Sequence, residues 1–250
     1  MSKRSKKIHK TVFTTLLVGS SLFVGSAIGD IVYRIKQSID NTAQVEPYLR
    51  AHKNEIEKEV ERKFSIALEG VALTFTDNLY SPMRYDPNQD VIIVGKNKWY
   101  AFLKRSNSFD PFKTVFTQST LVGTYIHELG HDYFYQIRKH LLSQGKIAPD
   151  KYMGYSILKV TIREGIADYF AVESGENRAG FFNAKEIDTV EKIYAQEKRY
   201  EYGRRIVKPI LDQLGAEQGI TQILLQPEIT EPELFRPALF QQRILRSYNH

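Results

Sequence analysis

The chain has 250 residues, 42% of them hydrophobic, which is enough for one folded core with an extension. Its net charge of +6 comes almost entirely from a basic stretch before residue 11, so the remainder is close to neutral and a nucleic-acid-binding protein is not expected. The absence of cysteine excludes a disulfide framework, a thiolate metal site and a lipid-modified N-terminal cysteine.

Residues 11–29 carry no charge and follow the basic stretch. As a helix they would span about 28 Å, close to the hydrocarbon thickness of a bilayer, about 30 Å. The excess of Lys and Arg ahead of them predicts a transmembrane anchor, with residues 1–10 as a cytoplasmic tail and the rest of the chain outside the cytoplasm. The alternative is a cleaved signal peptide and a secreted protein, because Ala27-Ile28-Gly29 places small residues before Asp30.

Residues 30–66 carry apolar side chains at helical spacing among many Lys and Glu, which predicts a helical stalk or first helix. Residues 67–250 are then expected to form the main domain. Within it, residues 71–75 and 90–94 are mostly apolar or β-branched and are separated by turn residues, which predicts two strands.

Three longer helices are predicted next, at about residues 117–142, 155–172 and 184–214, the last interrupted near Gly203. A short helix to about residue 225, a proline-containing segment and a last short helix follow. A small sheet followed by several helices indicates an α+β fold.

Residues 127–131 read His-Glu-Leu-Gly-His. Positions four apart on a helix lie about 40° off register and about 6 Å along the axis, so His127 and His131 can reach one ion. Glu128 lies about 100° round the helix, is not needed as a ligand, and can act as base toward a water activated by the metal. The motif predicts a zinc hydrolase.

A catalytic zinc site normally has three protein ligands, so a third must be found. Positions 134 and 137 are Phe and Ile, which excludes the long metzincin signature, and the other histidines are not at a ligand spacing. A carboxylate is the better candidate. The run Arg-Glu-Gly-Ile-Ala-Asp at residues 163–168 provides Glu164, with Asp168 one turn later on the same helical face.

Together the two motifs resemble the gluzincin group of zinc metallopeptidases, over about residues 117–172. The resemblance implies a zincin-like fold, Glu164 as the third zinc ligand and Asp168 as the carboxylate that holds a ligating imidazole; such second hydrogen bonds are usual for metal-bound histidines. The pattern Arg-Glu-x-x-Ala-Asp-x-x-Ala from residue 163 is also similar to the HtpX-like family of membrane-bound zinc peptidases. This chain differs from that family in its single possible membrane span and its shorter gap between the motifs.

The expected function is a zinc-dependent metallopeptidase, anchored in a membrane, that hydrolyses peptide or protein substrates with Glu128 as general base. Stabilising the oxyanion requires a second electrophile, for which Tyr202, beside Gly203, is the candidate. An extended substrate is expected along a strand edge, for which residues 90–94 are the candidate, unless they form an ordinary core strand. Two alternatives remain: a catalytically silent zincin-like binding module at the membrane surface, and a zinc hydrolase of a non-peptide amide.

Overall fold

The computed structural model describes residues 45–77, 81–95, 118–174 and 199–248. They form an α+β fold with a small three-stranded sheet and mostly helices, within one compact unit, Glu46–His250. The expected anchor at residues 11–29 lies outside these ranges. Within them, no helix combines the length and the apolar character needed to cross a bilayer.

The first helix, α2 (Val45–Phe64), confirms the helical prediction for the described part of residues 30–66. It packs against the later helices through both an apolar and a polar contact. The ring of Phe64 lies 4.4 Å from that of Phe170, and the buried phenol of Tyr125 donates a hydrogen bond of 2.7 Å to Glu57. This helix is therefore a packed part of the unit Glu46–His250.

The sheet contains β1 (Ala72–Thr76), β2 (Met83–Asp86) and β3 (Val91–Gly95), in the order β1-β3-β2. β3 is parallel to β1 and antiparallel to β2. The two predicted strands are confirmed, each shifted by one residue, whereas β2 was not predicted. It is only four residues long and lies between Pro82 and Pro87, so its alternation of buried and exposed side chains was too short to stand out from the turn residues.

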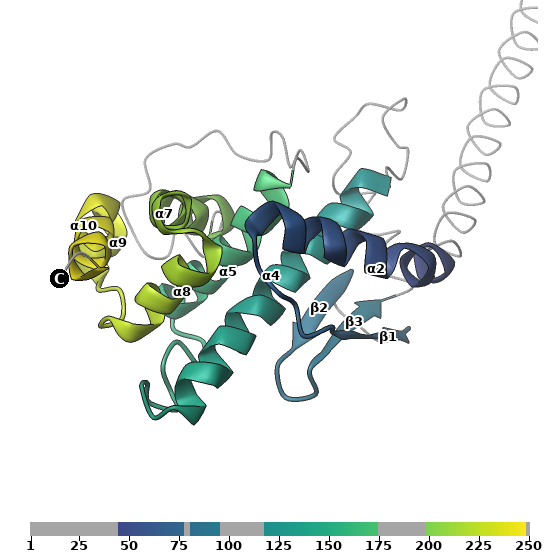
Figure 1. Ribbon diagram of the computed structural model, residues 1–250, viewed down its shortest axis with the longest axis horizontal. Coiled ribbons are helices and arrows are strands. Elements are labelled where there is room, and N and C mark those ends of the chain that lie inside the picture. The colour runs from purple at the N-terminus through teal and green to yellow at the C-terminus, as the bar shows by residue number, and fades with distance from the viewer. Residues whose placement is uncertain (1–44, 78–80, 96–117, 175–198, 249–250) are drawn as a thin grey trace, which may run out of the picture. The chain divides into compact units, whose positions relative to one another are not determined.

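Three long helices follow: α4 (Gln118–Ser143), α5 (Ile157–Glu173) and α7 (Arg199–Leu214). Figure 1 shows α4 between the sheet and the helices that come after it. The described part of the third predicted helix continues through Gly203, so the predicted interruption there is wrong. The glycine is needed for a close helix crossing, described below, and not for a break.

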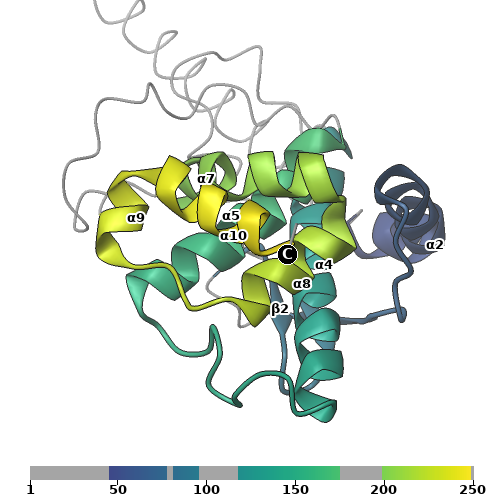
Figure 2. The ribbon, with the colours of Figure 1, turned by 60° about the vertical axis from the view of Figure 1, so that its left-hand side comes forward.

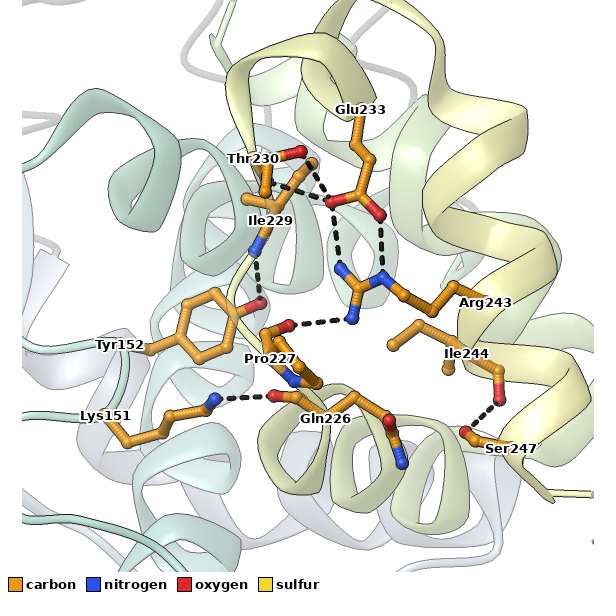
Figure 3. A network of polar contacts seen from close by, with 10 residues as sticks. All are labelled: Lys151, Tyr152, Gln226, Pro227, Ile229, Thr230, Glu233, Arg243, Ile244 and Ser247. Carbon is orange, nitrogen blue, oxygen red and sulfur yellow. Dashed lines mark hydrogen bonds and ion pairs between the residues drawn. The ribbon is translucent and has the colours of Figure 1, made fainter.

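The C-terminal helices α8 (Ala216–Leu225), α9 (Glu231–Phe235) and α10 (Pro237–Tyr248) lie on the opposite side of α4 from α2 (Figure 2). Figure 3 shows the polar contacts that hold this part together. Arg243 donates two hydrogen bonds to Glu233, at 2.7 and 2.9 Å, and a third to the Pro227 carbonyl. Glu233 also caps α9 with Thr230, and the amide of Ile229 donates to the Tyr152 phenol. We call residues Tyr152, Pro227, Ile229, Thr230, Glu233 and Arg243 the C-terminal network.

Candidate metal centre

The two histidines of the first motif lie one turn apart on α4, as their spacing predicts. Their ring centroids are 4.9 Å apart and the ring planes are nearly perpendicular, at 88°. His127 is buried, with 4% of its surface exposed, and the His131 side chain is 15% exposed. Both imidazoles therefore point from one face of the helix into the interior.

Helix α5 comes close to this face because α4 has a glycine at the crossing. A Cβ atom on Gly130 would lie 2.7 Å from the Cα of Ala167, closer than such atoms approach. With both residues small, the helices approach until the Glu164 side chain can reach the imidazoles. The fourth residue of the His-Glu-Leu-Gly-His motif thus determines where the third candidate ligand lies.

The Glu164 carboxylate lies between the two imidazoles. Its Oε2 atom is 3.3 Å from Nε2 of His127 and 3.3 Å from Nε2 of His131. All three candidate ligand atoms fall within 4.8 Å of one another, a group that could hold a metal ion. The structure therefore brings together the three residues that the two sequence motifs singled out.

The charges in this group depend on one another. Burial raises the pKa of the Glu164 carboxyl, but the charges and hydrogen bonds of His131 and His127 outweigh it and hold that pKa well below its ordinary value. Burial lowers the pKa of His131, yet the Glu164 carboxylate, helped by the charge of Glu128, raises it overall. An ionised carboxylate facing two imidazoles favours a positive charge at this point, carried either by protons or by a cation.

The carboxylate of Glu128 is directed at the sheet. Its Oε2 atom accepts a hydrogen bond of 2.8 Å from the backbone amide of Tyr85, in the edge strand β2. Both residues are buried, each with 7% of its surface exposed. Because β2 was not predicted from the sequence, this contact was not predicted either. The available signal for the strand was the alternation of side chains in the Met-Arg-Tyr-Asp run.

Helix α7 crosses α5 at a pair of glycines, Gly165 and Gly203. A Cβ atom on Gly203 would lie 2.8 Å from the Cα of Gly165 and would collide with the Thr161 carbonyl. This crossing brings the residue one turn earlier, Tyr200, over the metal centre, with its ring centroid 5.5 Å from that of His127. Burial, together with the charge of Glu164, raises the pKa of the Tyr200 phenol, so the phenol stays protonated.

The expectation for Tyr202 needs correction. Its hydroxyl donates a hydrogen bond of 2.7 Å to the Leu234 carbonyl at α9, so the structure directs it to α9 and not to the metal centre. Two residues on a helix are separated by about 200°, so Tyr200 and Tyr202 cannot share a face. Tyr200 lies three residues, or about one turn, before Gly203, and this spacing from the close crossing was the available sequence signal for it.

Asp168 is buried, with 4% of its surface exposed. Its Oδ2 atom forms an ion pair of 3.0 Å with Nε of Arg204 on α7. The expected partner of Asp168 was a ligating imidazole, whereas this contact joins α5 to the helix that carries Tyr200. The carboxylate is therefore part of the support around the metal centre, and its bond to an imidazole stays a prediction.

In comparisons with protein-family models, with curated proteins and with solved structures, nothing matches this chain.

Proposed function

We propose that this chain is a zinc-dependent metallopeptidase, with His127, His131 and Glu164 as the zinc ligands. The observation that carries the proposal is the convergence of three ligand atoms beside a fourth, non-ligand carboxylate, that of Glu128. Zinc prefers tetrahedral sites with nitrogen and oxygen bonds of about 2.0–2.1 Å, which sets neighbouring ligand atoms about 3.3–3.4 Å apart. Both distances from Glu164 to the imidazoles, at 3.3 Å, fit that spacing.

A bound zinc ion would lower the pKa of a water molecule to about 7 and polarise the scissile carbonyl. Glu128 would act there as the general base, accepting a proton from the attacking water and passing it to the leaving amine. Tyr200 replaces Tyr202 as the candidate for stabilising the oxyanion, since its phenol is protonated and its ring lies against His127. A purely structural site would not need a base such as Glu128.

The resemblance to the gluzincin group supports this assignment, and so does a zincin-like reading of the fold, with a small sheet beside the helix that carries the two histidines. The substrate strand must be reassigned. β3 is paired on both sides, so residues 91–94 of the candidate segment lie in the central strand of the described sheet, and Asp90 lies in the turn before it. β2 is the edge strand next to α4, and we propose that an extended peptide binds along it.

The chain is proposed to act outside the cytoplasm, held by an N-terminal anchor or released by signal cleavage, as the charge pattern of residues 1–29 predicts. A folded unit that begins well after residue 29 is compatible with either arrangement.

The test is metal content and hydrolysis of a peptide pool, measured on the full chain in detergent, for wild type, Glu128→Gln and Glu55→Gln. Glu55 is an exposed glutamate of α2 and serves as the matched control. We expect about one zinc per chain in all three proteins. Peptide turnover should fall about 10²–10⁴-fold in Glu128→Gln alone.

A wild type without zinc would refute the proposal. A zinc-bound wild type that hydrolyses no peptide would favour the silent binding module or a non-peptide amide substrate. Full turnover by Glu128→Gln would remove Glu128 from the role of base.

A further inference from the structure

Tyr85 of β2 contacts the metal helix at two points. Its backbone amide donates to the Glu128 carboxylate at 2.8 Å. Its ring packs against that of Tyr135 on the same helix, with centroids 5.6 Å apart. Glu128 and Tyr135 are seven residues apart, about two turns, and lie on the same face of the helix, so a single residue of the strand contacts both.

The phenol is itself held from the other side. It donates a hydrogen bond of 2.7 Å to Oδ1 of Asp90, in the turn that joins β2 to β3. The position of the ring is therefore set by α4 and by the hairpin turn together.

These contacts limit how β2 can move against α4. A single hydrogen bond between a strand amide and a side chain would let the strand slide or rotate. The second contact, of the Tyr85 ring with Tyr135 about two helical turns away, fixes both the distance and the angle between strand and helix. The amide of Tyr85 then meets one oxygen of Glu128 in a defined direction, and this restricts the rotamer of the carboxylate.

We propose that Tyr85 is a positioning residue for Glu128: the hydrogen bond of its phenol to Asp90 and the packing of its ring on Tyr135 hold its backbone amide against the base. The inference rests on the proposed function for what Glu128 does, but the arrangement itself is independent of the substrate. Small displacements of a catalytic group are costly, since a 1 Å misplacement can reduce rates about 100-fold. If Tyr85 served only to pack the core, replacing it would lower the stability of the protein but would not change the rate of the chemical step.

The test is Tyr85→Phe in the full chain in detergent, with zinc content, thermal unfolding, kcat and KM on a peptide substrate. We expect unchanged zinc content, a KM within about twofold and a kcat lower by about tenfold, because the amide stays but its direction is no longer fixed. Tyr169→Phe is the matched control. Its phenol likewise donates to a carboxylate, Asp212, at 3.1 Å, and its removal should leave kcat unchanged.

Asp90→Asn provides the conservative rescue. Asparagine keeps an oxygen that accepts the phenol, and it tolerates the positive φ of 56° at this position. We expect it to keep most of the wild-type kcat. A Tyr85→Phe protein that loses stability as Tyr169→Phe does, but keeps its kcat, would overturn the inference and leave the proposed function intact.

A second measurement separates the inference from peptidase activity. In cobalt-substituted protein the visible spectrum changes with pH as groups near the ion ionise, and a reoriented Glu128 should shift the midpoint by about 0.5 pH unit in Tyr85→Phe. Identical midpoints in the two proteins would overturn the inference. If the wild type hydrolyses no peptide, the proposed function fails and the midpoint still decides the role of Tyr85.

Discussion

The candidate metal centre and the C-terminal network are both clusters of polar side chains, the first largely buried and the second partly exposed, and their charges are balanced differently. In the C-terminal network the carboxylate of Glu233 receives two hydrogen bonds from Arg243 and others from Thr230, so a permanent cation and local donors match the acceptor. At the metal centre the carboxylate of Glu164 faces two imidazoles, whose charge depends on pH.

The difference shows which arrangement is complete without a ligand. A guanidinium remains charged at any ordinary pH and forms two parallel bonds, so the C-terminal network stabilises the fold unaided. Two imidazoles are neutral at alkaline pH, and a buried carboxylate would then face no full positive charge from them, which is unfavourable. A divalent cation would supply that charge.

Glu164→Ala should have the largest effect, because it removes a ligand. Loss of a residue that supports a ligand weakens metal binding about 10–100-fold, so loss of the ligand itself should exceed that range. The measurement is zinc affinity by competition with a chelating dye. In wild type, zinc at 100 times its dissociation constant should also stabilise the fold by about 2.7 kcal/mol, and chelation should reverse this.

The control for that variant is Glu173→Ala on the same helix, where the glutamate pairs with Lys208 at the surface. It should bind zinc as wild type does. If Glu164→Ala kept wild-type affinity, the third ligand would be a different residue and the comparison between the two regions would lose its basis.

Gly203→Ala should have the next largest effect, because the added methyl group meets backbone atoms at the crossing of α5 and α7. Overpacking usually costs about 1–3 kcal/mol, and contact with backbone that cannot move away places this case at about 3 kcal/mol or more, despite the better helix propensity of alanine. Denaturant unfolding measures it. Arg205→Ala, at an exposed position of the same helix, is the control and should change stability by less than about 0.5 kcal/mol.

Gly203→Ala should also displace Tyr200, so hydrolysis should fall by more than the loss of folded protein explains. An unfolding free energy within about 0.5 kcal/mol of wild type would contradict the close crossing.

Asp168→Asn should weaken zinc binding about 10–100-fold if the carboxylate also orients an imidazole, as the gluzincin resemblance implies. Arg204→Gln separates this role from the contact with α7. It removes the ion pair but leaves the carboxylate, so it should lower stability with a smaller change in zinc affinity. Equal zinc affinities for wild type and Asp168→Asn would restrict Asp168 to joining α5 and α7.

The parts that sequence predicts well are those set by local spacing. His127 and His131 lie on one helical face because they are four residues apart, and Glu164 and Asp168 share a face for the same reason. Contacts that depend on how two helices cross could not be predicted from spacing along one helix. The choice of Tyr200 over Tyr202 depends on which side of α7 packs on α5, and that side is set by the pair Gly165 and Gly203.

β2 illustrates a second limit. A four-residue strand between two prolines has too little periodicity for a sequence pattern to identify, and its position at the sheet edge comes from pairing with β3. The consequences for the candidate site were large, because the amide that contacts Glu128 belongs to this strand.

The smallest expected effect concerns the C-terminal network. Glu233→Gln replaces charge-assisted bonds with neutral ones and should lower the unfolding free energy at pH 7 by about 1 kcal/mol, with zinc affinity unchanged. Arg246→Gln, at an exposed position of α10, is the control and should have no measurable effect on either quantity.

The pH dependence of the unfolding free energy tests the same stabilising contribution of the Glu233 carboxylate. Hydrogen bonds from Arg243 hold the pKa of Glu233 below its ordinary value. A carboxyl group whose pKa is lower in the folded state stabilises the fold above its unfolded pKa, about 4.3, and this contribution disappears as the pH falls through the folded value. The difference between wild type and Glu233→Gln, measured by denaturant unfolding, should therefore shrink below about pH 4.3. Zinc stabilisation should disappear at a higher pH than this, because the Glu164 carboxylate raises the pKa of His131 and this imidazole becomes protonated before the Glu233 carboxyl does. If both contributions vanished at the same pH, the contrast between a ligand-dependent and a self-sufficient region would be wrong.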